Sequence, residues 1–132
     1  MKFTRATDYA VRLLVHLASK DGEGTSIELS RRLDIPFNHL AKLVQALARK
    51  GYLITKKGKG GGLRLAKDPK QISLADIIET TEGTIVMSDC LFHRESCKFS
   101  RSCKFRKYLG KVQNKVHSLF ANETIFDLIS TN

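Results

Sequence analysis

The chain has 132 residues, of which 42% are hydrophobic, and it carries a formal net charge of +10. This length fits one domain, or a small domain with an arm, and the composition excludes a disordered chain because enough apolar side chains are present to form a core. No signal-type apolar run follows Met1, and no stretch approaches about eighteen uninterrupted apolar residues. We therefore expect a cytoplasmic protein with no membrane partner, in which thiols stay reduced.

The positive charge is concentrated in the first half of the chain. Residues 1–70 hold 15 lysines and arginines against 6 acidic residues, whereas residues 71–132 hold 8 against 7. A basic half beside a near-neutral half indicates that the first half meets a polyanion. A merely soluble basic surface is the alternative that charge alone leaves open.

The first predicted elements are three helices. Apolar residues recur at helical spacing over residues 7–18, and a glycine-containing break follows at 21–24. A short helix is expected over residues 26–33, a turn at 34–36, and a third helix over 38–50. The residues expected to begin or end these helices are Ser26, Pro36 and Gly51. Two short helices joined by a tight turn predict a helix-turn-helix.

A β-hairpin is expected next, because two β-prone runs, residues 52–55 and 63–65, flank a glycine-rich tip. A helix-turn-helix followed by a basic hairpin is the element order of a winged helix. The glycines do not form a nucleotide-binding loop, because no Gly-Lys-Ser/Thr follows and both flanks are strand-like. A capping-box-like start at Ser73 and Asp76 predicts a short helix that ends near Thr80.

The last predicted helix has apolar residues at spacings of four and three, typical of a seam that packs against another helix. They are Phe105, Leu109, Val112, Val116 and Leu119. Thr124 is expected to cap a terminal turn. The predicted fold class is mainly α with a small β-hairpin. It comprises a winged helix-turn-helix over residues 1–70, a short helix and a cysteine loop over 71–104, and a long C-terminal helix with its turn over 105–132.

Candidate DNA-binding side chains lie on the third helix and on the hairpin tip. Those on the helix are Asn38, His39, Lys42, Gln45 and Arg49, and those on the tip are Lys56, Lys57 and Lys59. The N-terminal turn of such a helix enters a major groove, where Asn and Gln pair with adenine edges. Lysines on a flexible tip suit phosphates or a narrow minor groove. A solvated helix face is the alternative for any single residue, but together they favour DNA binding.

The only cysteines are Cys90, Cys97 and Cys103, separated by six and then five residues. Five cations and one acidic residue accompany them, which favours thiolates, the form that binds metal. These spacings differ from the Cys-x2-Cys pairs of structural zinc sites, so an iron–sulfur cluster fits better than zinc. The alternative is that the three cysteines are unrelated and pack as small hydrophobic residues without binding a metal. His93 lies nearby in the sequence, but nothing orients it as a base, so we do not predict an enzyme.

With these features in place, the sequence resembles the Rrf2 family of winged-helix regulators, typified by IscR, NsrR and RirA, from Met1 to about Ile129. The residues that carry the resemblance are Thr4 with Asp8-Tyr9-Ala10, the wing at 58–65, the helix at 73–78, the three cysteines and the turn at 124–128. The resemblance implies a homodimer built on the C-terminal helix, a palindromic DNA operator, and an iron–sulfur cluster on the three cysteines, with 4Fe–4S favoured over 2Fe–2S.

The resemblance also implies a fourth cluster ligand, on which members of the family differ. IscR-like members use a histidine three residues after the last cysteine, where this chain has Arg106. NsrR-like members use an aspartate early in the first helix of the partner subunit, and Asp8 stands at that place; Asn38-His39 and Lys42 also resemble the NsrR recognition helix. RirA-like members lack that aspartate, and residues 87–90 resemble theirs somewhat. We expect Asp8 of the partner subunit as the ligand, with His93 as the substitute; a helix-terminal charge is the other role for Asp8.

The sequence therefore predicts a dimeric DNA-binding regulator, a repressor in preference to an activator, whose cluster senses nitric oxide, redox or iron status. The alternative is a redox protein with an iron–sulfur cluster, or a zinc-stabilised winged helix, without specific operator binding. One property distinguishes the two hypotheses. Only the regulator should lose affinity for duplex DNA steeply as the salt concentration rises.

Overall fold

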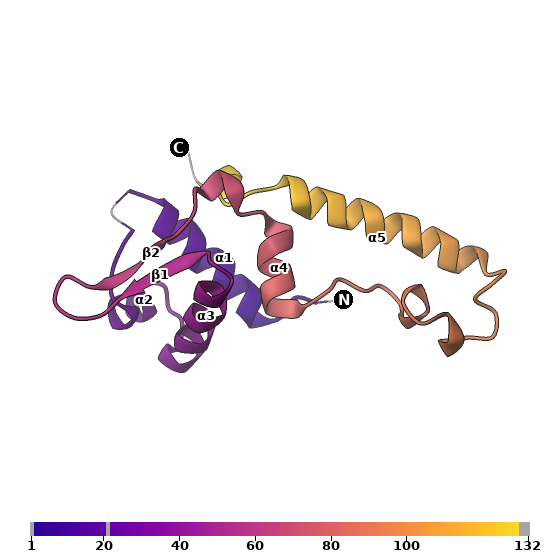
Figure 1. The fold of residues 1–132 in the computed structure, drawn as a ribbon, viewed down its shortest axis with the longest axis horizontal. Helices are drawn as coiled ribbons and strands as arrows, with labels where there is room; N and C mark the ends of the chain where they lie inside the picture. Colours follow the sequence, from indigo (N-terminus) through magenta and orange to yellow (C-terminus); the bar gives the residue numbers. More distant parts are fainter. Residues whose placement is uncertain (1, 21, 130–132) are drawn as a thin grey trace.

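The computed structural model describes residues 2–20 and 22–129, so the parts of the predicted segments at residues 1, 21 and 130–132 lie outside this description. Figure 1 shows a winged-helix body from which one long helix projects. The elements in chain order are α1 (Arg5–Ala18), α2 (Ser26–Arg32), α3 (Phe37–Arg49), β1 (Leu53–Lys56), β2 (Gly62–Leu65), α4 (Leu74–Glu82) and α5 (Lys104–Asn122). The 3-10 turns are η1 (Pro69–Gln71), η2 (Asp89–Leu91), η3 (Arg94–Ser96) and η4 (Phe126–Leu128). The predicted fold class is confirmed.

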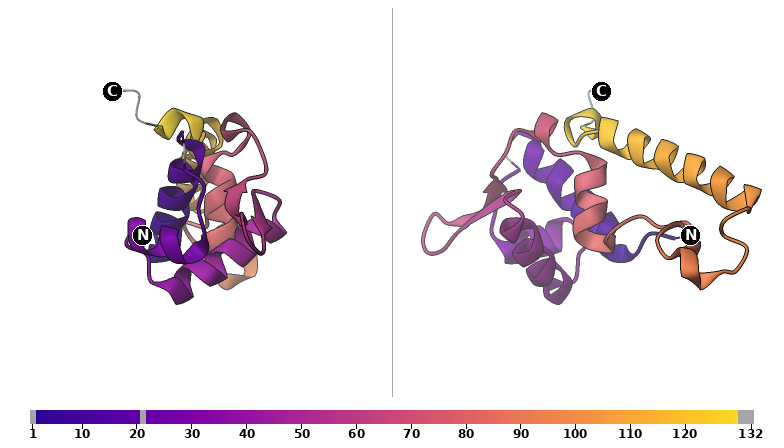
Figure 2. Two further views of the ribbon diagram at one scale, coloured as in Figure 1. Left: turned by 90° about the vertical axis from the view of Figure 1, so that its left-hand side faces the viewer. Right: turned by 45° about the vertical axis from the view of Figure 1, so that its right-hand side comes forward.

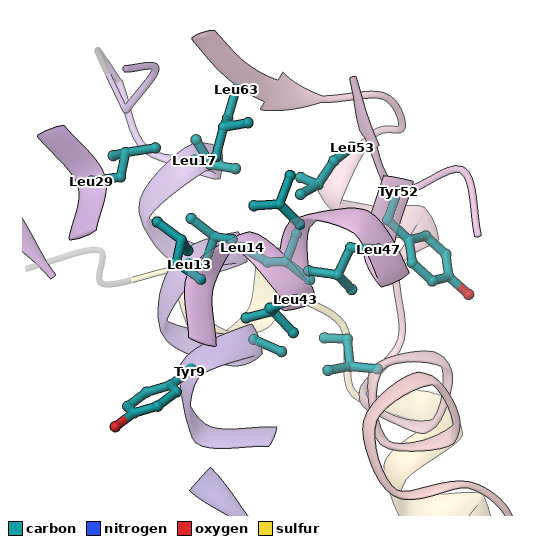
Figure 3. Packing of buried hydrophobic residues seen from close by; sticks show 14 of the residues in the cluster. Tyr9, Leu13, Leu14, Leu17, Leu29, Leu43, Leu47, Tyr52, Leu53 and Leu63 are labelled. Carbon is teal, nitrogen blue, oxygen red and sulfur yellow. The ribbon is translucent and has the colours of Figure 1, made fainter. Parts of the chain in front are cut away.

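The hydrophobic core lies in the winged-helix body, where α1 packs against α3. Leu13 and Leu14 of α1 and Leu47 of α3 are fully buried, and Figure 3 shows these side chains in one cluster with Leu43. Fully burying a leucine contributes about 1.5–3 kcal/mol. The apolar spacing that predicted α1 and α3 therefore gives the two helices a shared core, which supports α3 on its buried side.

Within the described residues, no helix is both long and apolar enough to cross a membrane.

The starts of α2 and α3 differ from the prediction in their caps. Thr25, not Ser26, caps α2, because its hydroxyl accepts from the backbone N–H of Glu28 at 3.2 Å. Pro36 is the N-cap residue of α3 and not its first helical residue. The turn between α2 and α3 needs Asp34 in the left-handed region, with φ of 54°, a conformation that Asp tolerates better than most residues. It directs α3 across α2.

The wing is the antiparallel hairpin of β1 and β2, in which Leu53 pairs with Leu65 and Lys56 pairs with Gly62. The backbone N–H of Leu63 also donates to Gly24 O at 2.8 Å, which ties the wing to the segment before α2. Gly61 is required in this loop because a Cβ there would stand 2.1 Å from Lys56 O. The glycine-rich tip is therefore a steric requirement of the turn and does not form a phosphate-binding loop.

The helix α4 begins with the predicted capping box, since Ser73 and Asp76 each accept a hydrogen bond from the other's backbone N–H. After α5 the chain returns to the body, where the N–H of Ile125 donates to Ile72 O at 2.9 Å and the Ile125 side chain is fully buried. Thr124 and Asp127 exchange hydrogen bonds around η4, although the N-cap residue is Ile125 and not the expected Thr124. Both ends of the α4–α5 segment are thus fixed to the winged helix.

The helix α5 has no buried residue, although it spans 19 residues. At the two ends of the predicted seam, Phe105 is 67% exposed and Leu119 is 71% exposed. Figures 1 and 2 show why: the segment after α4 runs out to the end farthest from the wing, and α5 leads from there back toward the body. The middle of the seam, Leu109, Val112 and Val116, is half-buried, so the seam is exposed mainly at its two ends.

Candidate nucleic-acid interface and thiol site

The predicted DNA-binding side chains are all exposed, and they lie on two neighbouring elements of the body. Asn38, His39, Lys42, Gln45 and Arg49 are on α3, and Lys56, Lys57 and Lys59 are on the end of β1 and the wing tip. Across the described residues, ion pairs are found only between Arg12 and Asp8 and between His93 and Glu95. The cations of the recognition helix and the wing are therefore free of carboxylate partners and available to an anion.

His39 also has a packing contact that the sequence did not indicate. Its ring meets the ring of Tyr9 edge-on, with centroids 5.8 Å apart. His39 and Lys42 line a hollow of about 310 Å³ between α3, the start of α1 and the end of α4, which Thr81 closes on the α4 side. The helix α3, which carries the predicted DNA-binding residues, is thus in direct contact with α1.

The three cysteines are free thiols in the segment of residues 83–103, hereafter the cysteine loop. Cys90 lies in η2 and is half-buried, Cys97 follows η3 and is exposed, and Cys103 is the N-cap residue of α5 and is half-buried. Three thiols fit the ligand chemistry of an iron–sulfur cluster. Among residues 2–20 and 22–129, however, no group of three or more His, Cys, Asp or Glu side chains is gathered as a metal site. The three thiols are present, but within the described residues of one chain they are not gathered into a metal site.

Asp8 lies on the winged-helix body and is engaged within its own helix. Its Oδ2 accepts from the Arg12 guanidinium at 2.6 Å, and the Asp8 side chain is 62% exposed. Arg12 also donates to Leu33 O at 2.9 Å. Asp8 borders a hollow of about 600 Å³ that Val15 and Leu128 also line. The structure therefore leaves Asp8 accessible from outside the chain, and it does not bring this carboxylate to the cysteine loop.

His93, the substitute ligand, is also exposed, with its Nδ1 3.5 Å from Glu95 Oε1. The residue at the IscR-type histidine position has a role that sequence reasoning missed. Arg106 donates from Nε to Cys90 O at 2.8 Å, and its backbone N–H donates to Cys103 Sγ at 3.4 Å. The spacing identified this arginine as a missing ligand, but it could not show that the side chain reaches back sixteen residues.

A second missed feature is a polar clasp between α1 and the end of α4, where the cysteine loop begins. Glu82 Oε2 accepts from Thr4 N at 2.7 Å, from Thr4 Oγ1 at 2.8 Å and from Thr7 Oγ1 at 2.5 Å. The Thr7 hydrogen bond is the largest cause that lowers the pKa of Glu82, and partial burial opposes it. Thr7 also shares a hydrogen bond of 2.6 Å with Thr81. No local signal could reveal contacts that join residues more than seventy positions apart.

Comparison with known proteins places this architecture in a family. The sequence model of the Rrf2 family, described as iron-dependent transcriptional regulators, matches residues 3–131. The chain belongs to the Rrf2 family. It is accordingly a DNA-binding transcriptional regulator and not an enzyme. The resemblance that the sequence motifs indicated is confirmed.

Among curated relatives, the regulators named NsrR of Shouchella clausii and of Bacillus subtilis are each 31% identical to this Rrf2 chain. The alignments cover 98% of this chain and 89% and 90% of those proteins. A transcriptional regulator of Listeria innocua has a similar structure, with a TM-score of 0.81, 25% identity, and coverage of 97% of this chain and 85% of that one. CymR of B. subtilis, the global cysteine regulator, has a TM-score of 0.79 at 21% identity, covering 100% of this chain and 98% of that one, which shows the fold alone.

Proposed function

We propose that this Rrf2 protein is a homodimeric, cytoplasmic repressor whose affinity for a palindromic operator depends on an iron–sulfur cluster, 4Fe–4S in preference to 2Fe–2S. The observation that carries the proposal is the cysteine loop, which holds three free thiols, among them the N-cap residue of the open helix α5. The similarity to NsrR proteins supports the same function. Residues 1–70 would bind DNA, residues 71–104 would bind the cluster, and residues 105–132 would form the dimer.

The ligands would be Cys90, Cys97 and Cys103, completed by Asp8 of the partner subunit. A bound cluster would supply a group that nitric oxide and oxygen attack and that iron shortage depletes. The change in operator affinity would then come from the chain's own residues. The open seam of α5 pairs the subunits, and the exposed Asp8 carboxylate can leave Arg12 for a ligand position across the dimer.

The position of Asp8 gives the ligand site a path to the recognition helix. Asp8 is on α1, and Tyr9, the next residue, contacts His39 of α3. When Asp8 binds the cluster in the partner's cysteine loop, α1 is held both by its own subunit and by the partner. When Asp8 is released, its carboxylate pairs again with Arg12. A ligand set that differs between the two states supplies the free energy that such a switch requires.

The first test is anaerobic purification followed by visible absorption and by measurement of the iron-to-sulfide ratio. The three variants Cys90→Ala, Cys97→Ala and Cys103→Ala should each lose the cluster, and the control Ser102→Ala, an exposed neighbour, should keep it. Operator affinity, measured by fluorescence anisotropy, should change on exposure to nitric oxide in the wild type and in Ser102→Ala, and not in the three cysteine variants. A colourless, iron-free protein whose DNA affinity ignores all three cysteine variants refutes the proposal, and zinc found in place of iron supports the purely structural alternative.

The second test separates a ligand role for Asp8 from its ion pair with Arg12. Asp8→Asn removes the carboxylate, whereas Arg12→Gln breaks the same ion pair and leaves the carboxylate in place. The cluster spectrum should change in the first variant and not in the second. If both variants keep the wild-type spectrum, the fourth ligand is not Asp8, and His93→Ala becomes the next variant to measure.

The third test concerns the DNA-binding side chains. Lys57→Gln on the wing removes a phosphate contact, so it should weaken all duplexes about equally and reduce the salt slope by roughly one. Asn38→Ala should weaken the operator more than unrelated DNA, because base contacts carry specificity. Lys67→Gln, an exposed lysine beyond the wing, is the control. Binding that does not respond to salt would point to the redox-protein alternative.

A further inference from the structure

Arg106 contacts the first and the last cysteine of the cysteine loop. It lies in the first turn of α5, three residues after Cys103, and its side chain is half-buried. Its Nε donates to the carbonyl oxygen of Cys90 at 2.8 Å, and its backbone N–H donates to the sulfur of Cys103 at 3.4 Å. One residue therefore contacts the first and the last of the three cysteines, which are thirteen positions apart in the sequence.

The other hydrogen bonds near Cys90 join neutral groups. Ser88 Oγ lies 3.2 Å from Cys90 Sγ, and the N–H of Met87 donates to Gln113 Oε1 on α5 at 2.9 Å. Within the short turn η2, Leu91 N donates to Ser88 O at 3.1 Å, and Asp89 O accepts from Phe92 N at 3.1 Å and from His93 N at 2.8 Å. The only cationic group bonded to the η2 backbone within the described residues is the Arg106 guanidinium.

A guanidinium is suited to this position for two physical reasons. Its planar N–H groups have fixed directions, so one of them can hold a carbonyl oxygen in a single geometry. It also stays positively charged at every relevant pH, and a hydrogen bond from a charged donor is roughly twice as strong as a neutral one. This positive charge is held at the backbone of Cys90, where it would attract the negative charge of a bound cluster.

We propose that Arg106 is the positioning residue of the thiol site: it fixes Cys90 relative to Cys103 and holds a permanent positive charge at the backbone of Cys90 without becoming a ligand. This inference rests on the proposed function for its second half, the effect of the charge on a bound cluster. Its first half, the anchoring of η2, concerns the apoprotein alone. Arg106 occupies the position at which IscR-like members have a ligand histidine. We infer that it is not a neutral replacement, because it also organises the cysteine loop, whose fourth ligand must come from elsewhere.

The experiment compares Arg106→Lys, which keeps the charge, with Arg106→Gln, which loses it. Lys107→Gln, an exposed neighbour on α5, is the matched control. The backbone N–H to Cys103 remains in every variant, so only the bond to Cys90 O and the charge change. Hydrogen–deuterium exchange of apoprotein peptides covering residues 88–93 should be about fivefold faster in the Gln variant, as expected for losing a partly exposed, charge-assisted hydrogen bond.

The second readout is the midpoint reduction potential of the cluster in anaerobically loaded protein. Loss of a nearby positive charge should make the potential more negative in Arg106→Gln, whereas Arg106→Lys should restore the wild-type value. Faster exchange with an unchanged potential would overturn the second half of the proposal, the effect of the charge on the cluster, and leave Arg106 as a structural anchor only. Exchange and potential that match Lys107→Gln would overturn both halves. If the wild type takes up no cluster, the proposed function fails, and the exchange rates alone decide for or against the anchor.

Discussion

Replacing Glu82 by Gln should loosen the contact between α1 and α4 and lower the stability of the apoprotein. One oxygen of this carboxylate accepts from Thr4 N, Thr4 Oγ1 and Thr7 Oγ1, at 2.7, 2.8 and 2.5 Å. The Gln side chain has the same shape and keeps an oxygen acceptor, so the substitution removes the charge with little change in packing. The three bonds then become neutral ones.

The magnitude follows from the number of bonds and their exposure. A charge-assisted hydrogen bond is roughly twice as strong as a neutral one, and a typical net contribution is about 0.5–1.5 kcal/mol per bond. The clasp lies at the surface, where water competes for the carboxylate, so each bond should lose only a few tenths of a kcal/mol. The sum is about 1 kcal/mol at neutral pH, which corresponds to a fall in Tm of roughly 3–5 °C for a domain of this size.

The pH dependence gives the sign of the effect. The hydrogen bond from Thr7 lowers the pKa of Glu82 below its usual 4.5. A carboxylate with a lowered pKa in the folded state stabilises the fold fully above the unfolded-state value, and the contribution is lost as pH falls through the folded value. The difference between wild type and Glu82→Gln should therefore be constant from neutral pH to about pH 5 and should shrink at more acidic pH.

Urea unfolding of the apoprotein, followed by circular dichroism at several pH values, measures this difference. The control is Glu79→Gln, an exposed glutamate on the same helix. Thr7→Val should reproduce part of the loss, and the double variant should lose less than the sum of the two single ones. Equal destabilisation by Glu82→Gln and Glu79→Gln, or a difference that persists in acid, would refute the reasoning.

Three further outcomes are expected. Leu47→Ala in the core of α3 should lower the free energy of unfolding by about 2–5 kcal/mol in urea titrations, because Leu47 is fully buried; a loss below 1 kcal/mol would contradict the packing of Figure 3. Gly61→Ala should reduce duplex affinity in anisotropy assays without loss of helical signal, because its Cβ would collide with Lys56 O. Burial is the main cause that lowers the pKa of His16 below 6.5. Stability should therefore fall as pH drops through that value, since the unfolded chain takes up a proton first, and His16→Gln should reduce this dependence.

The winged helix was predictable because its signals are local. The apolar spacing of α1 and α3, Gly51 after α3, and the capping box at Ser73 each act within one element, and the wing glycines act within one turn. The wrong caps, Ser26, Pro36 and Thr124, are also local, and each error is of one residue. Helix termini are decided by single hydrogen bonds, such as Thr25 Oγ1 accepting from Glu28 N, which neighbouring Ser and Thr residues can both offer.

The site was only partly predictable, because its important contacts connect distant residues. The sequence identified the three cysteines and Asp8 as candidate ligands, and these roles stay predictions. It gave no sign that Arg106 reaches Cys90 O or that Glu82 holds Thr4 and Thr7. Charged side chains at exposed positions have many possible partners, and only the placement of α4 and α5 in the fold selects among them.

The two missed residues together define how a change in the cysteine loop can reach DNA. Arg106 fixes the loop to α5 at one end, and Glu82, the residue before the loop, fixes α4 to the first turn of α1 at the other. The same α1 carries Asp8 and, through Tyr9, contacts His39 of α3. We therefore expect Glu82→Gln to reduce the difference in operator affinity between cluster-loaded and apo forms, while the affinity of the apo form stays near the wild-type value. If this difference in operator affinity is the same in wild type and Glu82→Gln, the signal reaches α1 only through Asp8 and its contact with the partner subunit.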